Sequence, residues 1–218
     1  MPAGEDTPRG RRALSKGRME GFSDGVFGFA ITLLVLDIAI RPPGTPLQQV
    51  LDAWPAYLAY VTSFLTIGGA WLLHTGLTDQ LARVDPIFLR LNLLVLLVVV
   101  VLPFPTHLVA FALHDTGSER VYITMYGLTL LAIRLLGFAL EAYARNQHLY
   151  APQQDDVQEV HRDRRKMLPI VIGYVIAIII GLYLPPVAAA LYLGLAVYLV
   201  VPFREVVRVL ARRHHSRP

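Results

Sequence analysis

Asp24 is the residue of this sequence whose chemistry most clearly requires a partner. It follows Ser23 about one turn into the first apolar stretch, where an unpaired carboxylate is expensive. Arg18 lies six residues earlier and falls on a different helical face, so the partner should come from another helix. The candidates at the same depth are His74, Trp71, Arg90 and Asn92. Such a cluster acts either as a structural polar lock or as a proton relay, and both interpretations stay open.

Two further ionisable residues fall within apolar stretches, where such groups are costly and often functional. Asp37 ends the first stretch. If copies of that helix surround a pore, its carboxylates form an acidic ring that concentrates cations; otherwise interfacial water solvates them. Arg134 lies in the middle of the fourth stretch, too far from Glu141 for a tight contact, and is expected to pair across helices or to mark a lipid site.

The third apolar stretch is broken by Pro103-Phe104-Pro105-Thr106-His107. Proline removes a backbone donor and frees a carbonyl, and such breaks build ion sites in transporters, although more of them are packing kinks. We expect a neighbouring group to satisfy His107.

Enzyme and metal chemistry find no support in the sequence. The phosphate-binding, zinc-protease, nucleophile-elbow and dinucleotide-binding motifs do not occur in a suitable context. The chain has no cysteine, which excludes thiol catalysis and cysteine-based metal sites. We therefore expect a protein that is not an enzyme and has no cofactor or metal site.

Six apolar stretches must position the residues named above. Of the 218 residues, 55% are hydrophobic and 17% are charged, against about 25% charged in soluble domains. Each stretch is close to the ~20 residues that cross a bilayer. The sequence therefore predicts an all-α, polytopic membrane protein with six transmembrane helices. The expected spans are 19–40, 54–74, 87–112, 120–144, 167–184 and 187–209, with Pro185-Pro186 joining the last two.

The positions of Lys and Arg predict the orientation. Of the 20 such residues, Arg41 and Arg120 fall on one side, Arg134 within a span and all the others on the opposite side. By the positive-inside rule, both termini are cytoplasmic in a multi-pass protein of the cell membrane. The net charge of +4 then reflects topology and attraction to lipid rather than a nucleic-acid partner. The expected divisions are a disordered basic N-terminus over 1–17, a membrane domain over 18–210 and a basic tail over 211–218.

The first helix carries two stripes. One is bulky, with spacings of 4, 3, 4, 3 and 4 typical of a packed seam: Phe22, Val26, Phe29, Leu33, Leu36 and Ile40. The other is small and permits close backbone approach: Gly21, Gly25, Gly28 and Thr32. A helix with both is packed on more than one side; the plainer alternative is an ordinary helix in the core of a bundle.

Arg18-x-x-x-Phe22-Ser23-Asp24, followed by GVFGFAITLLVLDI, closely resembles the first-helix signature of the transmembrane protein 175 family. These are potassium-permeable channels of endosomes and lysosomes, with bacterial and archaeal relatives. Trp71-x-x-His74 is similar to the family pattern at the end of the second helix. Leu91-Asn92-Leu93-Leu94 and Leu102-Pro103-Phe104-Pro105-Thr106 are similar to its third helix.

The resemblance implies a mechanism. Animal members carry two six-helix repeats per chain and this chain carries one, which implies a homotetramer in the lipid bilayer with helix 1 lining a central fourfold pore. The family's pore residues fall on Phe29, Leu33 and Leu36, with Thr32 as a polar layer and Asp37 at the outer mouth. The family usually has Ile or Leu at its narrowest position, where this chain has Phe29. The interhelical polar network of the family, structural or part of the gate, falls on Arg18, Ser23, Asp24, Trp71, His74 and Asn92.

A hydrophobic constriction is a poor ligand for a bare cation, so monovalent cations would pass mostly hydrated, with modest preference for potassium over sodium. The alternative is a proton- or ion-coupled secondary transporter that uses Asp24, His74 and the broken third helix. The sequence has no convincing internal repeat, which disfavours it. A third alternative is a membrane scaffold that moves no ions.

Overall fold

The computed structural model describes residues 16–38, 44–112, 119–151 and 157–201. The expectations for residues 1–15, for Ile40 and Arg41, and for the tail over 211–218 lie outside these ranges. The elements are α1 (Lys16–Leu34), the 3-10 helix η1 (Val35–Asp37), α2 (Pro46–Asp52), α3 (Trp54–Asp79), α4 (Pro86–Val101), α5 (Pro103–Ala112), α6 (Glu119–Asn146), α7 (Val157–Gly181) and α8 (Pro185–Val200).

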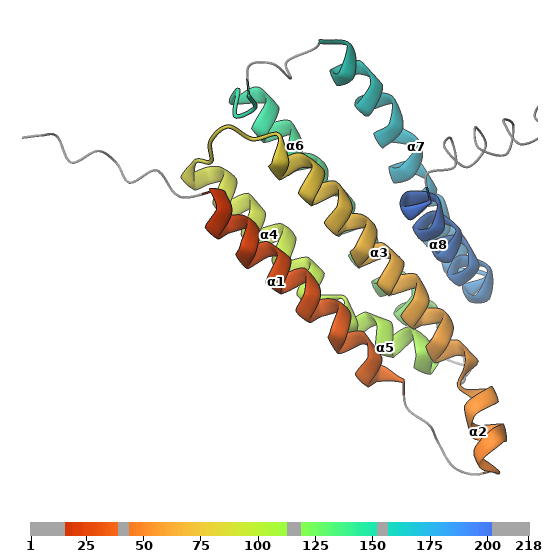
Figure 1. Ribbon diagram of the computed structural model, residues 1–218. Helices are drawn as coiled ribbons and strands as arrows, with labels where there is room; N and C mark the ends of the chain where they lie inside the picture. The colour runs from red at the N-terminus through yellow and green to blue at the C-terminus, as the bar shows by residue number, and fades with distance from the viewer. Residues whose placement is uncertain (1–15, 39–43, 113–118, 152–156, 202–218) are drawn as a thin grey trace, which may run out of the picture.

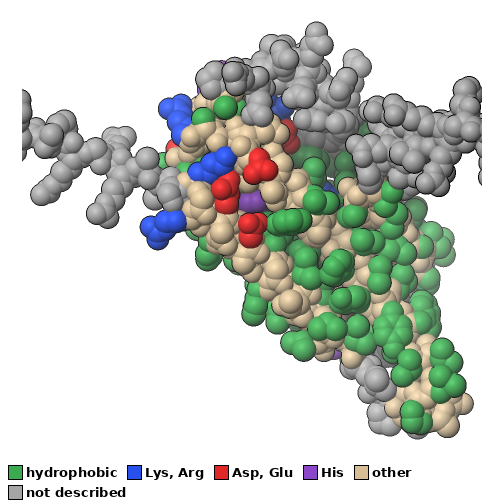
Figure 2. All heavy atoms as spheres, in the orientation of Figure 1, with side chains coloured by type: hydrophobic (Ala, Val, Ile, Leu, Met, Phe, Trp, Pro, Cys, Tyr) green, Lys and Arg blue, Asp and Glu red, His purple; other side chains and the backbone are tan. Residues whose placement is uncertain are grey.

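The long helices form an elongated bundle (Figure 1). Helix α1 lies along one edge beside α3 and α4, and α7 and α8 lie along the other edge, against α6 and α3 respectively. A continuous buried core joins these helices and includes Phe27 of α1, Ile67 of α3, Phe88 of α4 and Leu130 of α6. Figure 2 shows hydrophobic side chains along much of the visible surface, with charged side chains gathered near the end where α1 begins. An apolar exterior with a charged end is the pattern of a protein surrounded by lipid.

Among the described residues, three helical segments are long and apolar enough to cross a membrane. They are Trp54–Asp79, Glu119–Asn146 and Pro86–Phe111, the last of which runs through both α4 and α5. Leu168–Gly181 and Pro185–Val200 are shorter apolar helices. Helix α1 carries Lys16, Arg18, Glu20 and Asp24 in its first half. The predicted all-helical membrane architecture therefore holds at this level, and the count of six spans stays a prediction.

Prolines set several helix boundaries. The predicted break in the third stretch is confirmed, because α4 ends at Val101 and α5 begins at Pro103. The prediction for Pro185-Pro186 is wrong: both residues lie in the first turn of α8, where a missing N–H costs nothing, and residues 182–184 make the connection.

Three further boundaries differ from the sequence prediction. Lys16 and Gly17, expected in a disordered terminus, begin α1. Helix α2 was not predicted; it begins at a capping box in which Thr45 and Gln48 bond reciprocally. Helix α7 begins at Val157, ten residues before the expected span and within the polar linker 145–166, which was expected to be a helical extension.

Candidate functional site

A buried hydrogen-bond network joins α1, α3 and α4. The Asn92 side chain donates from Nδ2 to Ser23 Oγ over 3.0 Å, and its Oδ1 lies 2.7 Å from His74 Nε2. A carbonyl oxygen only accepts, so in this arrangement His74 carries its proton on Nε2. Ser23 is 0%, Asn92 2% and His74 6% exposed. Because buried polar groups are costly unless they are bonded, this network holds three helices in one register.

A second contact lies beside the buried network, at the exposed edge of α1. Trp71 Nε1 donates to Asp24 Oδ1 over 2.8 Å. Trp71 and His74 are three residues apart on α3 and therefore share a face. The ring of His74 packs against Phe27, with centroids 5.4 Å apart. Helix α3 thus contacts α1 through both of its polar side chains at this level.

The structure brings together most of the polar residues that the sequence singled out. Ser23, Asp24, Trp71, His74 and Asn92 form the two sets of contacts above. Asp24 takes its partner from another helix, and the donor is Trp71 rather than Arg90, which is exposed. Arg18 lies in the first turn of α1 with an exposed side chain.

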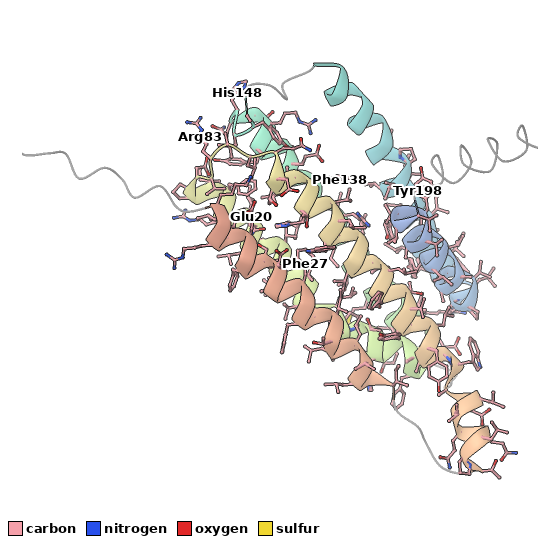
Figure 3. The ribbon with its side chains drawn as sticks, viewed as in Figure 1. Glu20, Phe27, Arg83, Phe138, His148 and Tyr198 are labelled. Carbon is pink, nitrogen blue, oxygen red and sulfur yellow. The ribbon has the colours of Figure 1, made fainter. Side chains whose placement is uncertain are left out.

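Helix α1 has one buried face and one uncovered face. The buried face packs into the bundle: Met19, Ser23, Phe27, Ala30 and Leu34. In Figure 3, Phe27 lies on the side of α1 that faces α3. On the uncovered face Phe22 is 57%, Phe29 59% and Leu36 74% exposed. A Cβ added at Gly21, Gly25 or Gly28 would meet nothing within 4 Å.

Two more predicted pore positions, Thr32 and Leu33, lie on or beside that uncovered face. Thr32 is exposed, and its hydroxyl donates to the carbonyl oxygen of Phe29 over 2.8 Å. Because the hydroxyl proton is used within the helix, the lone pairs of Thr32 Oγ1 stay available to a cation. Leu33 is half-buried, and Asp37 ends η1.

Arg134 is buried in α6 at 3% exposure. Among the residues that the structure describes, its Nε and Nη2 atoms make no hydrogen bond, and Arg134 interacts electrostatically with Tyr174 of α7. Glu141 pairs instead with Arg145, over 3.1 Å. Within the described part of the chain, Arg134 therefore makes no salt bridge to a carboxylate, and the expectations that it pairs across helices or marks a lipid site both stay predictions.

Sequence reasoning missed a second buried cluster, formed by Ser63, Thr106 and Tyr126. Ser63 and Thr106 lie 43 residues apart, and Ser63 and Tyr126 lie 63 residues apart. A hydroxyl residue in an apolar stretch at a proline break was the available signal for Thr106. Tyr126 gave none, because tyrosine is common in such helices.

This fold and site define a multi-pass α-helical membrane protein whose first helix is locked to two neighbours on one face and left uncovered on the other. Comparison with known protein families then identifies the family to which this protein belongs. The chain belongs to the TMEM175 family, described as endosomal/lysosomal potassium channel TMEM175, which matches residues 18–103. That range contains the whole network from Ser23 to Asn92.

Curated relatives agree with this assignment. A potassium channel of Streptomyces collinus is 44% identical over 143 residues, 64% of this chain and 69% of that protein. A potassium channel of Chamaesiphon minutus is 38% identical over 151 residues, 66% of this chain and 73% of that protein. The endosomal/lysosomal proton channel TMEM175 of Gallus gallus is 36% identical over 117 residues, 49% of this chain and 23% of that protein.

A solved structure extends the similarity along most of the chain. The crystal structure of a lysosomal potassium-selective channel TMEM175 homologue from Chamaesiphon minutus superposes with a TM-score of 0.72 at 32% identity. The match covers 84% of this chain and 95% of that chain. The arrangement of helices in the bundle is therefore that of a TMEM175 channel subunit.

Proposed function

We propose that this chain forms a potassium-permeable cation channel in which four copies of α1 surround a central pore. The observation that carries the proposal is the uncovered face of α1. Phe22, Phe29 and Leu36 recur on it every seven residues and are all more than half exposed. Bare glycines beside them leave room for another helix to approach closely. The bacterial relatives named potassium channels support the same assignment.

The proposed channel has six spans per chain. Three of these spans are the long apolar helices. The other three are the shorter apolar helices α7 and α8 and the partly charged α1. The charged first turns of α1 then lie at the cytoplasmic interface, with both termini cytoplasmic in the cell membrane. Helices α4 and α5 together make one span across the proline break.

The constriction of the proposed pore lies at Phe29, Leu33 and Leu36, with Thr32 supplying a polar layer. Rings of apolar side chains gate by excluding water, so ions cross mostly hydrated once the pore is wet. Potassium gives up hydration water more readily than sodium, and Thr32 Oγ1 has lone pairs to replace part of it. A tenfold preference requires only about 1.4 kcal/mol, so selectivity is modest.

The two sets of contacts around Ser23 and Asp24 hold the pore helix in place. Asn92 fixes the rotation of α1 from its buried side, and Trp71 fixes it from the edge. A rotation of α1 that moved Phe29 away from the axis would break both contacts. The polar residues therefore act on the pore through register and not by contact with the permeant ion. Asp37, at the outer mouth, concentrates cations.

The test is ion flux into liposomes that contain the purified protein, with potassium, sodium and a large organic cation measured separately. Phe29→Ala should change the potassium rate or the potassium-to-sodium ratio. Phe104→Ala is the matched control, because Phe104 on α5 is 62% exposed, close to the 59% of Phe29. Potassium flux that is unchanged by Phe29→Ala would refute the pore assignment. A monodisperse tetramer without ion flux would refute the channel function.

A further inference from the structure

Three buried hydroxyl groups form a directed chain of hydrogen bonds at the break between α4 and α5. Thr106 Oγ1 donates to the Leu102 carbonyl oxygen over 2.8 Å and lies 2.7 Å from Ser63 Oγ, which in turn lies 2.8 Å from the Tyr126 hydroxyl. Each hydroxyl has one proton. Since the hydroxyl proton of Thr106 is donated to the Leu102 carbonyl, Ser63 must donate to Thr106 and Tyr126 must donate to Ser63.

This hydrogen-bond chain ends on a backbone carbonyl beside the proline break, at Leu102. Pro103 and Pro105 have no N–H group, so the helical ladder is incomplete around the break. The Leu102 carbonyl accepts both from Thr106 Oγ1 and from the Thr106 backbone N–H, the latter over 3.1 Å. Ser63, Thr106 and Tyr126 are 0%, 1% and 2% exposed, so no bulk water replaces a lost member.

The same chain of hydroxyls ties together the supports of the outer end of α1. Tyr126 lies on α6, Ser63 on α3 and Thr106 on α5. Helices α3 and α5 both contact η1, which continues α1 and carries Leu36. In Figure 1, α5 lies close to the end of α1 that leads into η1. A shift of α5 relative to α3 would therefore move η1.

We infer that the hydroxyl chain Tyr126–Ser63–Thr106 positions the outer end of the pore helix and thereby sets the rate of ion passage. The inference rests on the proposed channel function and adds three positioning residues to it. None of them lies on α1, and none touches the permeant ion. The geometry of the α4–α5 break becomes part of the pore through η1.

The three links differ in what their loss leaves behind. Tyr126→Phe removes a donor and leaves Ser63 with an unused acceptor, which is the mildest change. Ser63→Ala leaves the Tyr126 hydroxyl without its acceptor, and Thr106→Val does the same to Ser63. A buried donor without an acceptor carries the full desolvation cost. Thr106→Ser keeps the hydroxyl and is the conservative control. Tyr192→Phe is a second control, because it removes a nearby tyrosine hydroxyl that lies outside this hydrogen-bond chain.

The experiment uses the absence of cysteine in the sequence. Leu36→Cys, labelled with a nitroxide, reports distances between copies in the assembled protein in liposomes, and unlabelled protein reports potassium flux. Tyr126→Phe, Ser63→Ala and Thr106→Val should all shift the Leu36–Leu36 distances. Potassium flux should change about fivefold in Tyr126→Phe, the size expected for one buried hydrogen bond, and by more in the other two. Thr106→Ser and Tyr192→Phe should match the wild type in both.

Unchanged distances and flux in the assembled Tyr126→Phe and Thr106→Val variants would overturn the inference. Tyr126→Phe keeps the ring, so its result stands even where Ser63→Ala fails to assemble. The double variant Tyr126→Phe/Thr106→Val should change flux and distances as much as the stronger single variant, because both substitutions break the same hydrogen-bond chain. Additive effects would contradict the inference. Shifted distances in a protein whose wild type passes no potassium would refute the channel while leaving the positioning intact.

Discussion

Trp71 Nε1 donates a hydrogen bond to Asp24 Oδ1 over 2.8 Å, and this contact joins the exposed edge of α1 to α3. Because this contact is exposed, water competes with it and its net contribution is modest. Trp71→Phe keeps an aromatic ring and removes the donor together with the pyrrole part of the indole. We expect a loss of about 0.5–1.5 kcal/mol in unfolding free energy, measured by thermal unfolding in detergent.

Trp54→Phe is the control for that substitution, since Trp54 is the other tryptophan and is 55% exposed at the start of α3. An equal loss in both variants would mean that the Asp24 contact adds nothing.

Within the part of the chain that the structure describes, Asn92 is the one residue of the buried network that bonds two partners at once. Asn92→Ala leaves the Nε2 proton of His74 without an acceptor and Ser23 without its donor. We expect a loss of about 1–3 kcal/mol or more in stability, measured by thermal unfolding. Asn146→Ala, at the exposed end of α6, should be close to neutral. Similar melting temperatures for the two variants would contradict the role of the network.

Gly25 faces open space within one chain, so a larger side chain there is tolerated by the monomer. In the proposed tetramer the same side chain meets a neighbouring copy of α1. Gly25→Val should therefore lower the assembled fraction in size-exclusion chromatography with light scattering. Gly194→Val on α8 carries the same helix penalty and also meets nothing within 4 Å. Retention of the tetramer by Gly25→Val would count against α1 as the central interface.

Two glycines of α6 make a matched pair for packing. A Cβ at Gly127 would collide with the Tyr192 hydroxyl and lie 2.7 Å from Ile178, whereas one at Gly137 meets nothing within 4 Å. Gly127→Ala should cost about 1–3 kcal/mol by overpacking. Gly137→Ala should gain about 0.5–1 kcal/mol from helix propensity. Melting temperatures that move in the same direction would refute the close approach of α6 and α8.

The sequence predicted the parts of this molecule that local spacing determines. Apolar stretches placed the long helices, and the Pro103-Phe104-Pro105 run placed the α4–α5 break. The cost of an unpaired carboxylate in an apolar stretch predicted an interhelical partner for Asp24. Trp71 and His74 were identified as candidates because they share the depth of Asp24 and a family pattern.

The sequence could not reveal contacts that depend on how helices rotate against one another. Ser63 bonds Tyr126, which lies 63 residues further along the chain, and no periodicity encodes that pairing. The burial of Arg134 at 3% exposure likewise emerges only from packing. Helix α2 was overlooked because seven residues are too few for an apolar repeat, although the Thr45–Gln48 capping box was readable.

The central claim, that the uncovered face of α1 lines an ion pathway, is tested most directly by thiol block in this cysteine-free chain. Phe29→Cys and Phe104→Cys would be reconstituted separately and treated with a positively charged thiol reagent while potassium flux is recorded. The account predicts that modification reduces flux through Phe29→Cys and leaves Phe104→Cys unchanged. Full modification of Cys at position 29 with undiminished potassium flux would contradict it.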